Sequence, residues 1–348
     1  MSGTGDRAAA PAAGDGETRL STRIDFDAEG KHCDYLRLPY SVNRSAYGWL
    51  PVPLVSIRNG GGPRVLLMGG VHGDEFEGQL TLTRLIQTLA PEDVSGQLII
   101  LPMANYPAAK AGARVSPLDD ANLNRVFPGR PDGTPTFQLA HYVETVLMPR
   151  VDYVFDLHSG GSSLHYLPTA ILQWSEDAAE RRRQIELARV FGTAFACFFQ
   201  GAHGGASSSA AAARQEAQAL VFEIGGSGTV TPESLRTCAR GVGNLLRHLG
   251  VLRDDGTAPP PAEPRVVAAL APESFVFALE DGVFAPAVDL GAEVRAGDLA
   301  GHLHRPETPW ADPEEVRFEA EGAVLCKRVP GRAERGDCLF HLGCPVEA

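Results

Sequence analysis

Lysine is almost absent from this chain of 348 residues. Only Lys31, Lys110 and Lys327 occur, so arginine supplies nearly all of the 31 basic side chains. The formal net charge is −12, and no basic cluster is found. Because nucleic acids and anionic membranes are recognised by basic patches, the sequence predicts neither of them as a partner.

Cysteine pairs and long apolar runs are missing as well. None of the six cysteines stands in a C-x-x-C pair, so all are expected to be reduced thiols without a catalytic or metal-binding role. No stretch approaches the ~20 apolar residues of a membrane span, and residues 1–19 lack the apolar core of a signal peptide. These absences predict a cytoplasmic protein whose first 19 residues form a disordered tail.

A proline-rich segment divides the rest of the chain. Residues 253–264 contain the run DDGTAPPPAEP, which is typical of an extended linker. Residues 20–252 alternate strand-like and helical patterns, which favours an α/β sheet with helices on both faces. Residues 265–348 contain short strand-like runs broken by glycines, which indicate a small all-β domain. The sequence therefore predicts a large first domain and a smaller second one.

Apolar periodicity predicts the elements of both units. In the first, strands are expected at 50–56, 64–70, 97–102, 151–156 and 219–224, and helices at 78–89, 136–147, 178–191 and 232–249. The last helix should begin with Thr231 as its N-cap and Pro232 at its first position. In the second unit, strands are expected at 275–279, 282–285, 323–328 and 338–342.

Two of the predicted strand ends carry candidate metal ligands. His72 and Glu75 follow the run 64–70, and His158 lies just past the run 151–156. H-x-x-E alone is a weak motif, and a lone histidine is more often structural. Sites in open α/β sheets form beyond the carboxyl ends of strands, however, so these side chains are expected to meet. Two imidazoles and a carboxylate suit Zn²⁺ and leave a fourth position for water.

Glu223 is the lone carboxylate in the apolar strand 219–224, and two glycines follow that strand. Burying a carboxylate costs free energy, and carboxylates with perturbed pKa values gather at functional sites. Metal-assisted hydrolysis also needs a proton acceptor for the attacking water. Glu223 is therefore our candidate general base, against the alternative of a structural glutamate paired with an arginine.

A polar loop at 114–129 carries Arg114, Asn122, Asn124 and Arg125. A guanidinium binds a carboxylate through two parallel hydrogen bonds, and an amide can add another. The loop is thus a candidate site for a substrate carboxylate. Taken alone, the loop would be better explained as a surface loop with solvated arginines.

Four motifs, HGDE, NLNRVFPG, DLHSGG and FEIGG, resemble in order and spacing the succinylglutamate desuccinylase/aspartoacylase family. The resemblance covers nearly the whole chain. It implies a zinc-carboxypeptidase-like α/β fold, in which helices flank a mixed sheet, with a smaller C-terminal all-β, barrel-sandwich-like domain. It also implies one Zn²⁺ per chain on His72, Glu75 and His158, with Glu223 as the general base.

The same resemblance suggests roles for the polar loop. Arg114 would polarise the scissile carbonyl, and Asn124 with Arg125 would hold the substrate carboxylate. Many family members carry an aspartate at the position of Asn122, a change expected to affect the support of the loop more than the ligand contacts.

Further segments, including 24–26, 36–41 and 129–134, resemble the branch of the family that deacetylates N-alpha-acetyl-L-2,4-diaminobutyrate in ectoine degradation. His165 stands where that branch tends to carry an aspartate suited to the substrate's free amine. We therefore list His165 as a candidate substrate-binding residue that should pair with an amine poorly. The segment 202–214 looks degenerate, with little to pack or recognise.

The expected activity is zinc-dependent hydrolysis of the amide bond of a small N-acyl amino acid, with N-alpha-acetyl-L-2,4-diaminobutyrate as the first choice. Another N-acyl amino acid, such as N-acetylaspartate or N-succinylglutamate, and metallocarboxypeptidase action are alternatives. An inactive module that binds a metal or small molecule is a third class. The expected partner is a small molecule, and a homo-oligomeric state is left open.

Overall fold

The computed structural model describes residues 18–199, 205–253, 256 and 262–346. Residues 1–17 of the expected tail, most of the expected linker and residues 202–204 lie outside this range. Up to residue 253 the strands are β1 (Gly30–Pro39), β2 (Trp49–Asn59), β3 (Arg64–Gly69), β4 (Gly96–Leu101), β5 (Tyr153–His158), β6 (Leu164–Gln173), β7 (Phe195–Phe199) and β8 (Gln218–Gly226).

The helices of this part are α1 (Phe76–Thr88), α2 (Tyr106–Ala111), α3 (Pro135–Tyr142), α4 (Ala178–Phe191), α5 (Ser208–Arg214) and α6 (Pro232–His248). Every helix and strand predicted here is present, with ends shifted by a few residues. Helix α3 continues through a π-helical turn (Val143–Leu147) and a 3-10 turn (Met148–Arg150). Thr231 caps α6 and Pro232 occupies its first turn, as predicted.

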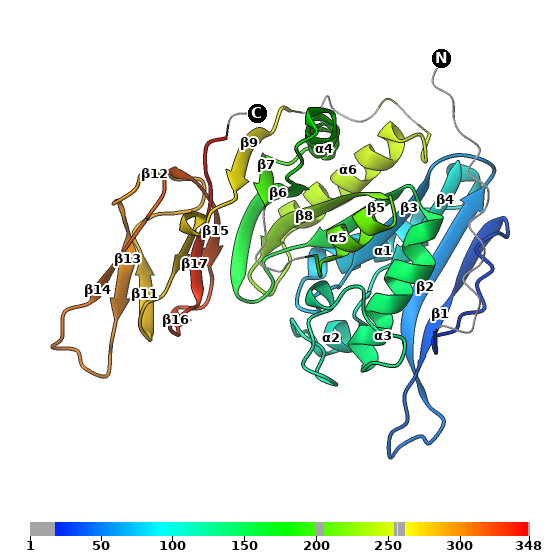
Figure 1. Ribbon diagram of the computed structural model, residues 1–348, viewed down its shortest axis with the longest axis horizontal. Helices are drawn as coiled ribbons and strands as arrows, with labels where there is room; N and C mark the ends of the chain where they lie inside the picture. Colours follow the sequence, from blue (N-terminus) through cyan, green and yellow to red (C-terminus); the bar gives the residue numbers. More distant parts are fainter. Residues whose placement is uncertain (1–17, 200–204, 254–255, 257–261, 347–348) are drawn as a thin grey trace.

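The remaining strands are β9 (Arg265–Ala269), β10 (Phe275–Phe277), β11 (Gly282–Pro286), β12 (Glu293–Val294), β13 (Leu299–His304), β14 (Glu314–Arg317), β15 (Gly322–Arg328), β16 (Arg332–Ala333) and β17 (Cys338–Gly343). All four strands predicted in this region are present. This C-terminal β region lies at one end of the molecule (Figure 1). Strands β14-β13-β11-β16 form a separate four-stranded sheet there.

The main sheet is mixed and has 13 strands, with the order β1-β2-β4-β3-β5-β8-β6-β15-β17-β10 and with β7, β9 and β12 off this path. Its centre is parallel, because β3 pairs in parallel with β4 and β5, and β5 with β8. The carboxyl ends of β3, β5 and β8 therefore meet at one edge of the sheet. This is where the candidate site residues were predicted to gather.

Hydrogen bonding in the main sheet crosses the predicted linker. Strand β6 pairs antiparallel with β15, and β7 pairs in parallel with β9. A small apolar cluster, which includes Cys197, Val267 and Leu325, packs this junction. The two predicted domains thus share one sheet, and the boundary between them stays a prediction.

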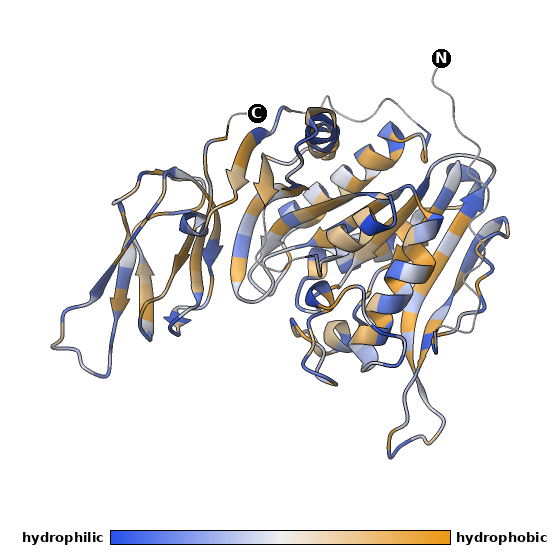
Figure 2. Cartoon of the chain, viewed as in Figure 1, coloured by the Kyte–Doolittle hydropathy of each residue, from blue (hydrophilic) through white to orange (hydrophobic). Residues whose placement is uncertain are grey.

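Two apolar clusters cover the opposite faces of the central strands. Figure 2 shows that these strands are largely hydrophobic. One face packs against residues of α1, α4 and α6, including Leu82, Phe191 and Leu246. The other packs against α3 and α5, through residues such as Leu139 and Ala212. Helices therefore lie on both faces, as predicted. No helix among the described residues is long and apolar enough to span a membrane.

Several elements were not predicted, and β6 shows why. Its sequence contains Pro168, and its register against β8 shifts between Tyr166 and Thr169. Proline cannot donate to a sheet ladder and is tolerated there only at edges and irregular positions. A sequence pattern with such a break does not by itself indicate a strand. Strand β6 is therefore defined by its pairing with β8 and β15.

Candidate metal centre and active site

The candidate ligands lie at the ends of two neighbouring parallel strands. His72 and Glu75 occupy the turn between β3 and α1, and Glu75 directly precedes the first helical residue. His158 is the last residue of β5, one step inside the strand rather than beyond it as predicted. Strand pairing aligns Gly69 of β3 with Leu157 of β5. The two segments are therefore brought together by sheet register.

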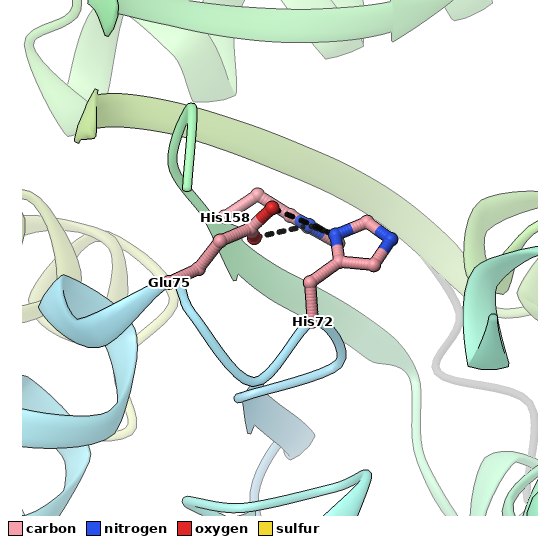
Figure 3. Close-up of side chains that lie close together, drawn as sticks. All are labelled: His72, Glu75 and His158. Carbon is pink, nitrogen blue, oxygen red and sulfur yellow. Dashed lines mark hydrogen bonds and ion pairs between the residues drawn. The ribbon is translucent and has the colours of Figure 1, made fainter. Parts of the chain in front are cut away.

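All three side chains point toward one another (Figure 3). The Glu75 carboxylate bridges the imidazoles, with Oε1 2.7 Å from His72 Nδ1 and Oε2 2.8 Å from His158 Nδ1. The two Nδ1 atoms are 3.2 Å apart. Less than 4% of each residue's surface is exposed. The expected meeting of these residues, on which the proposed metal site depends, is confirmed.

Electrostatics in this cluster favour a charged carboxylate. Burial alone would raise the pKa of Glu75, but His72 and His158 outweigh it and hold that pKa well below its usual range. Burial lowers the pKa of His72. Burial also opposes protonation of His158, yet Asp156 and Glu75 raise its pKa well above the ordinary value. The protein thus buries charged groups, at a cost in desolvation free energy, where two imidazoles and a carboxylate lie close together.

The donor set fits a divalent metal ion. Within the described residues, His72, Glu75 and His158 are the one group of histidine, cysteine and acidic side chains whose ligand atoms all lie within 4.8 Å of one another. Two imidazole nitrogens facing each other across a carboxylate form the kind of three-ligand set that zinc takes in catalytic sites. His302 and His304, a second pair of histidines close together in sequence, lie on β13 outside this group.

Each imidazole has a polar partner on its far side. His72 Nε2 is 3.1 Å from Asn122 Oδ1. His158 Nε2 is 2.9 Å from Asp156 Oδ2, a close charge pair that is not aligned as a hydrogen bond. Such partners orient metal-binding histidines and leave the other ring nitrogen free for the metal. Asn122 Oδ1 also accepts a hydrogen bond of 2.9 Å from the Asn124 backbone N–H. The side chain therefore supports the loop, as expected, and in addition contacts the candidate ligand His72, which was not expected.

Glu223 lies beside His158, since strand pairing aligns the two residues at the ends of β8 and β5. The residue is half-buried, but its Oε2 atom is buried and has no hydrogen-bond partner in the described part of the chain. Burial, together with the nearby Glu75 carboxylate, raises the pKa of Glu223 to about 8. Within the described structure no arginine forms an ion pair with it, so the geometry favours the catalytic alternative.

Two arginines from the polar loop face this acidic group. Arg114 Nη1 is 3.4 Å from Glu75 Oε1, and the Arg114 side chain remains 43% exposed. Burial and the like charge of Arg114 lower the pKa of Arg125, while Glu223 and Glu75 oppose that change. Two guanidinium groups that repel each other are stabilised by an anion between them. The pair is thus suited to a carboxylate or a developing oxyanion.

Asn124 is held by Ser208, which belongs to the segment 202–214 that was expected to have little to pack or recognise. Its Oδ1 accepts a hydrogen bond of 2.8 Å from the backbone N–H of Ser208, at the start of α5. This contact fixes the orientation of the amide and leaves its NH₂ group as the donor for a ligand. Ser208, Ala211 and Ala212 are buried. The described part of 202–214 therefore packs closely, and the expectation that it has little to pack was wrong.

His165 lies on β6, where it pairs in register with Gly226, just past Glu223 on β8. Its Nδ1 atom is 2.8 Å from Ser227 Oγ. Burial and the neighbouring Lys327 lower the pKa of His165. An imidazole that stays neutral can accept a hydrogen bond through its other nitrogen. The assignment of His165 to the substrate site stays a prediction.

Sequence reasoning gave no role to Asp156 or Ser208. A spacing of two on a strand places Asp156 on the same side as His158, which is a readable signal. No comparable signal marks Ser208, because its contacts come from residues far away in the chain.

The structure has a mixed sheet flanked by helices, with a buried His-Glu-His cluster at the ends of its parallel strands. This arrangement is typical of hydrolases that use a metal ion. Residues 61–249 match the family model described as the succinylglutamate desuccinylase/aspartoacylase catalytic domain. The chain belongs to this family of amide-hydrolysing enzymes.

Similar proteins cover nearly the whole chain. The N-alpha-acetyl-L-2,4-diaminobutyric acid deacetylase of Halomonas elongata is 38% identical over 94% of this chain and 96% of its own. Product-bound ectoine utilization protein EutE (DoeB) from Ruegeria pomeroyi is 35% identical and superposes with a TM-score of 0.90 over 94% of this chain and 99% of its own. A succinylglutamate desuccinylase/aspartoacylase from Rhodobacter sphaeroides gives 0.89 at 35% identity, over 95% and 100% of the two chains.

Proposed function

We propose that this enzyme is a zinc-dependent deacetylase that converts N-alpha-acetyl-L-2,4-diaminobutyrate to acetate and 2,4-diaminobutyrate. The observation that carries the chemistry is the His72–Glu75–His158 cluster with Glu223 beside it. The choice of substrate is supported by the relative from Halomonas elongata, which is similar to this chain over 94% of its length.

His72, Glu75 and His158 would hold one zinc ion, which fits their nitrogen and oxygen donors. When bound, zinc would polarise the scissile carbonyl and lower the pKa of a water toward about 7. Glu223 would take a proton from the attacking water and later return it to the leaving nitrogen. The proton returned to the nitrogen is the one taken from the water, so the carboxylate is regenerated at the end of the reaction.

The polar loop supplies binding and charge stabilisation. Arg114, beside Glu75, would stabilise the oxyanion that develops on the carbonyl. Arg125 and the NH₂ group of Asn124 would bind the substrate carboxylate. A substrate carboxylate bound there would direct the neighbouring acyl amide toward the proposed zinc site, and such orientation contributes to the rate of hydrolysis.

His165 is our candidate for recognising the side-chain amine. Because its pKa is lowered, the imidazole is neutral near pH 7 and can accept a hydrogen bond from an ammonium group. This modifies the initial expectation that histidine would pair poorly with an amine. His165→Ala should raise KM for N-alpha-acetyl-2,4-diaminobutyrate and leave N-acetyl-2-aminobutyrate, which lacks the amine, unaffected.

The decisive experiment combines metal analysis with an amine-release assay. Zinc-loaded protein is incubated with N-alpha-acetyl-L-2,4-diaminobutyrate, N-acetyl-L-aspartate, N-succinyl-L-glutamate and a dipeptide with a free C-terminal carboxyl group. Fastest turnover of the first compound supports the proposal. Faster turnover of the second or third moves the enzyme to another substrate, and cleavage of the dipeptide indicates a carboxypeptidase.

Two further outcomes address the zinc centre itself. Zinc binding with no turnover of any compound would indicate a binding module and overturn the proposed activity. Full turnover after exhaustive removal of metal would overturn the zinc centre.

A further inference from the structure

Ser208 is a fully buried serine to which the proposed chemistry assigns no role. Its side-chain hydroxyl and its backbone N–H each donate a hydrogen bond. The backbone N–H donates to Asn124 Oδ1 at 2.8 Å, and the hydroxyl donates to Asp156 Oδ2 at 2.6 Å. These acceptors are 32 residues apart in the chain, and they belong to different parts of the site.

Each acceptor leads to one of the two candidate metal-binding imidazoles. The hydroxyl bond reaches Asp156 Oδ2, which lies 2.9 Å from His158 Nε2. On the other side, the backbone N–H of Asn124 donates to Asn122 Oδ1 at 2.9 Å, and the same oxygen lies 3.1 Å from His72 Nε2. A chain of polar contacts therefore runs from His158 through Ser208 to His72.

We propose that Ser208 is a positioning residue, whose hydroxyl holds Asp156 against the metal-binding His158 while its backbone N–H holds the substrate-binding Asn124. The inference rests on the proposed zinc centre. It assigns to the start of α5 the task of setting the metal ligand and the carboxylate-binding side chain relative to each other.

The orientation of Asp156 depends strongly on this hydroxyl. Asp156 is 1% exposed, and its Oδ1 atom has no hydrogen-bond partner among the described residues. Its other oxygen therefore carries the contacts to both Ser208 and His158. Removing the hydroxyl leaves the carboxylate free to turn away from the imidazole. Loss of such an outer partner typically weakens metal binding about 10- to 100-fold.

The two donors of Ser208 can be separated by substitution. Ser208→Ala removes the hydroxyl and keeps the backbone N–H that holds Asn124. The variant should thus bind zinc about 10- to 100-fold more weakly. At saturating zinc its KM should stay within about twofold of wild type, because the contact to Asn124 survives. Ser208→Thr keeps a hydroxyl and should retain the wild-type zinc affinity.

Ser209 offers a matched control in the same helix. It is also buried, but its hydroxyl contacts Gln173 Nε2 and Ser207 Oγ instead of Asp156. Ser209→Ala removes the same atom one residue away, so it reports on the packing of α5. Its zinc affinity should stay within about twofold of wild type.

The experiment measures zinc affinity by competition with a chromophoric chelator, and circular dichroism with thermal melting of the metal-free proteins confirms folding. In a double-mutant cycle, Ser208→Ala added to Asp156→Ala should cause no further loss, because the hydroxyl acts through Asp156. If Ser208→Ala does not fold, Asp156→Ala alone replaces it, with the same expected loss.

Several results would overturn the proposal. The first is wild-type zinc affinity in folded Ser208→Ala, or in Asp156→Ala where that variant is used instead. The second is an equal loss of zinc affinity in Ser208→Ala and Ser209→Ala. The third is an additive loss of zinc affinity in the double-mutant cycle. Wild-type protein that binds no zinc would overturn the zinc centre and this proposal together. Wild-type protein that binds zinc, with unaffected Ser208→Ala, overturns the role of Ser208 alone.

Discussion

Along β5 and β8, neighbouring residues serve opposite faces of the sheet, and the two faces differ in chemistry. Phe222 and Ile224 belong to the apolar cluster that also contains residues of α1, α4 and α6. Asp156, His158 and Glu223 alternate with such apolar residues and form the polar surroundings of the candidate metal centre. Phe222 and Glu223 are adjacent in sequence and lie in these two environments.

This difference follows from the two-residue period of a strand. Near the carboxyl ends of these strands, one side of the sheet closes a dry core, while the other carries charges that would be costly to bury without partners. Farther back along the same strands, both sides are apolar. Substitutions on the apolar face should therefore change the free energy of unfolding. Substitutions on the polar face should change catalysis or binding. Substitutions of Glu223 and Phe222 test this separation directly. Substitutions of His341 and Arg125 extend it to other buried and polar positions, in order of decreasing expected effect.

Glu223→Gln should lower kcat/KM about 10²- to 10⁴-fold, the usual contribution of a general base. The thermal midpoint should change little, because burial and Glu75 already raise the pKa of this carboxyl to about 8. Steady-state kinetics, metal analysis and thermal melting measure the three properties. Loss of zinc from the variant would mean that Glu223 is itself a ligand.

Phe222→Ala should lower the free energy of unfolding by about 3–5 kcal/mol, as expected for truncating a buried aromatic side chain. Phe222 is fully buried and stacks on Phe191, with ring centroids 3.9 Å apart. Denaturant titration gives the loss, and the folded variant should keep one zinc per chain. A loss below about 1 kcal/mol would contradict the importance of this face.

His341 tests burial at the junction with the C-terminal β region. Burial lowers its pKa to about 4, below the value of about 6.5 for an exposed histidine. Between these values the unfolded chain binds a proton that the folded protein does not. Stability is thus complete above pH 6.5 and falls as the pH drops toward 4, by at most about 3 kcal/mol.

His341→Gln removes this titration, so its stability should depend less on pH in that range. Unfolding free energies measured from pH 4 to 7 test the expectation. His304→Gln, at an exposed position on β13, serves as the control. Equal pH dependence of wild type and His341→Gln would show that the folded protein accepts the proton freely.

Arg125→Ala should raise KM about 10- to 100-fold, which corresponds to roughly 1.5–3 kcal/mol for hydrogen bonds to a charged group. The effect on kcat should be smaller, since the carboxylate contact is made before and during the reaction. Arg130, just beyond this loop, is the control, because its guanidinium packs over the Phe137 ring of α3. Unchanged KM in Arg125→Ala would remove that residue from the carboxylate site.

Much of the central architecture could be predicted from local pattern. The strands that become β3, β5 and β8 are compact apolar runs, and α4 and α6 show clear helical spacing. The rule that sites form at the carboxyl ends of parallel strands then brings His72, Glu75 and His158 together. Strand β6 escaped prediction because Pro168 and a register shift interrupt its pattern.

Outer contacts of the site could not be predicted in the same way. Asn122 contacts His72 across 50 residues, and Ser208 contacts Asp156 across 52. Such contacts depend on the paths of loops and on the docking of α5, neither of which has a local signature. For that reason the segment containing Ser208 looked degenerate, and the contact of Asn122 with His72 was not predicted.

By itself, the sequence determined which residues carry reactive groups and at which strand ends they stand, because hydrophobic periodicity and short-range spacing are local properties. Only the tertiary structure decided which polar partners orient those groups, and that the C-terminal strands continue the main sheet. Long-range hydrogen bonds and strand pairings form between segments that the linear pattern does not relate, so they exist only once the chain has folded.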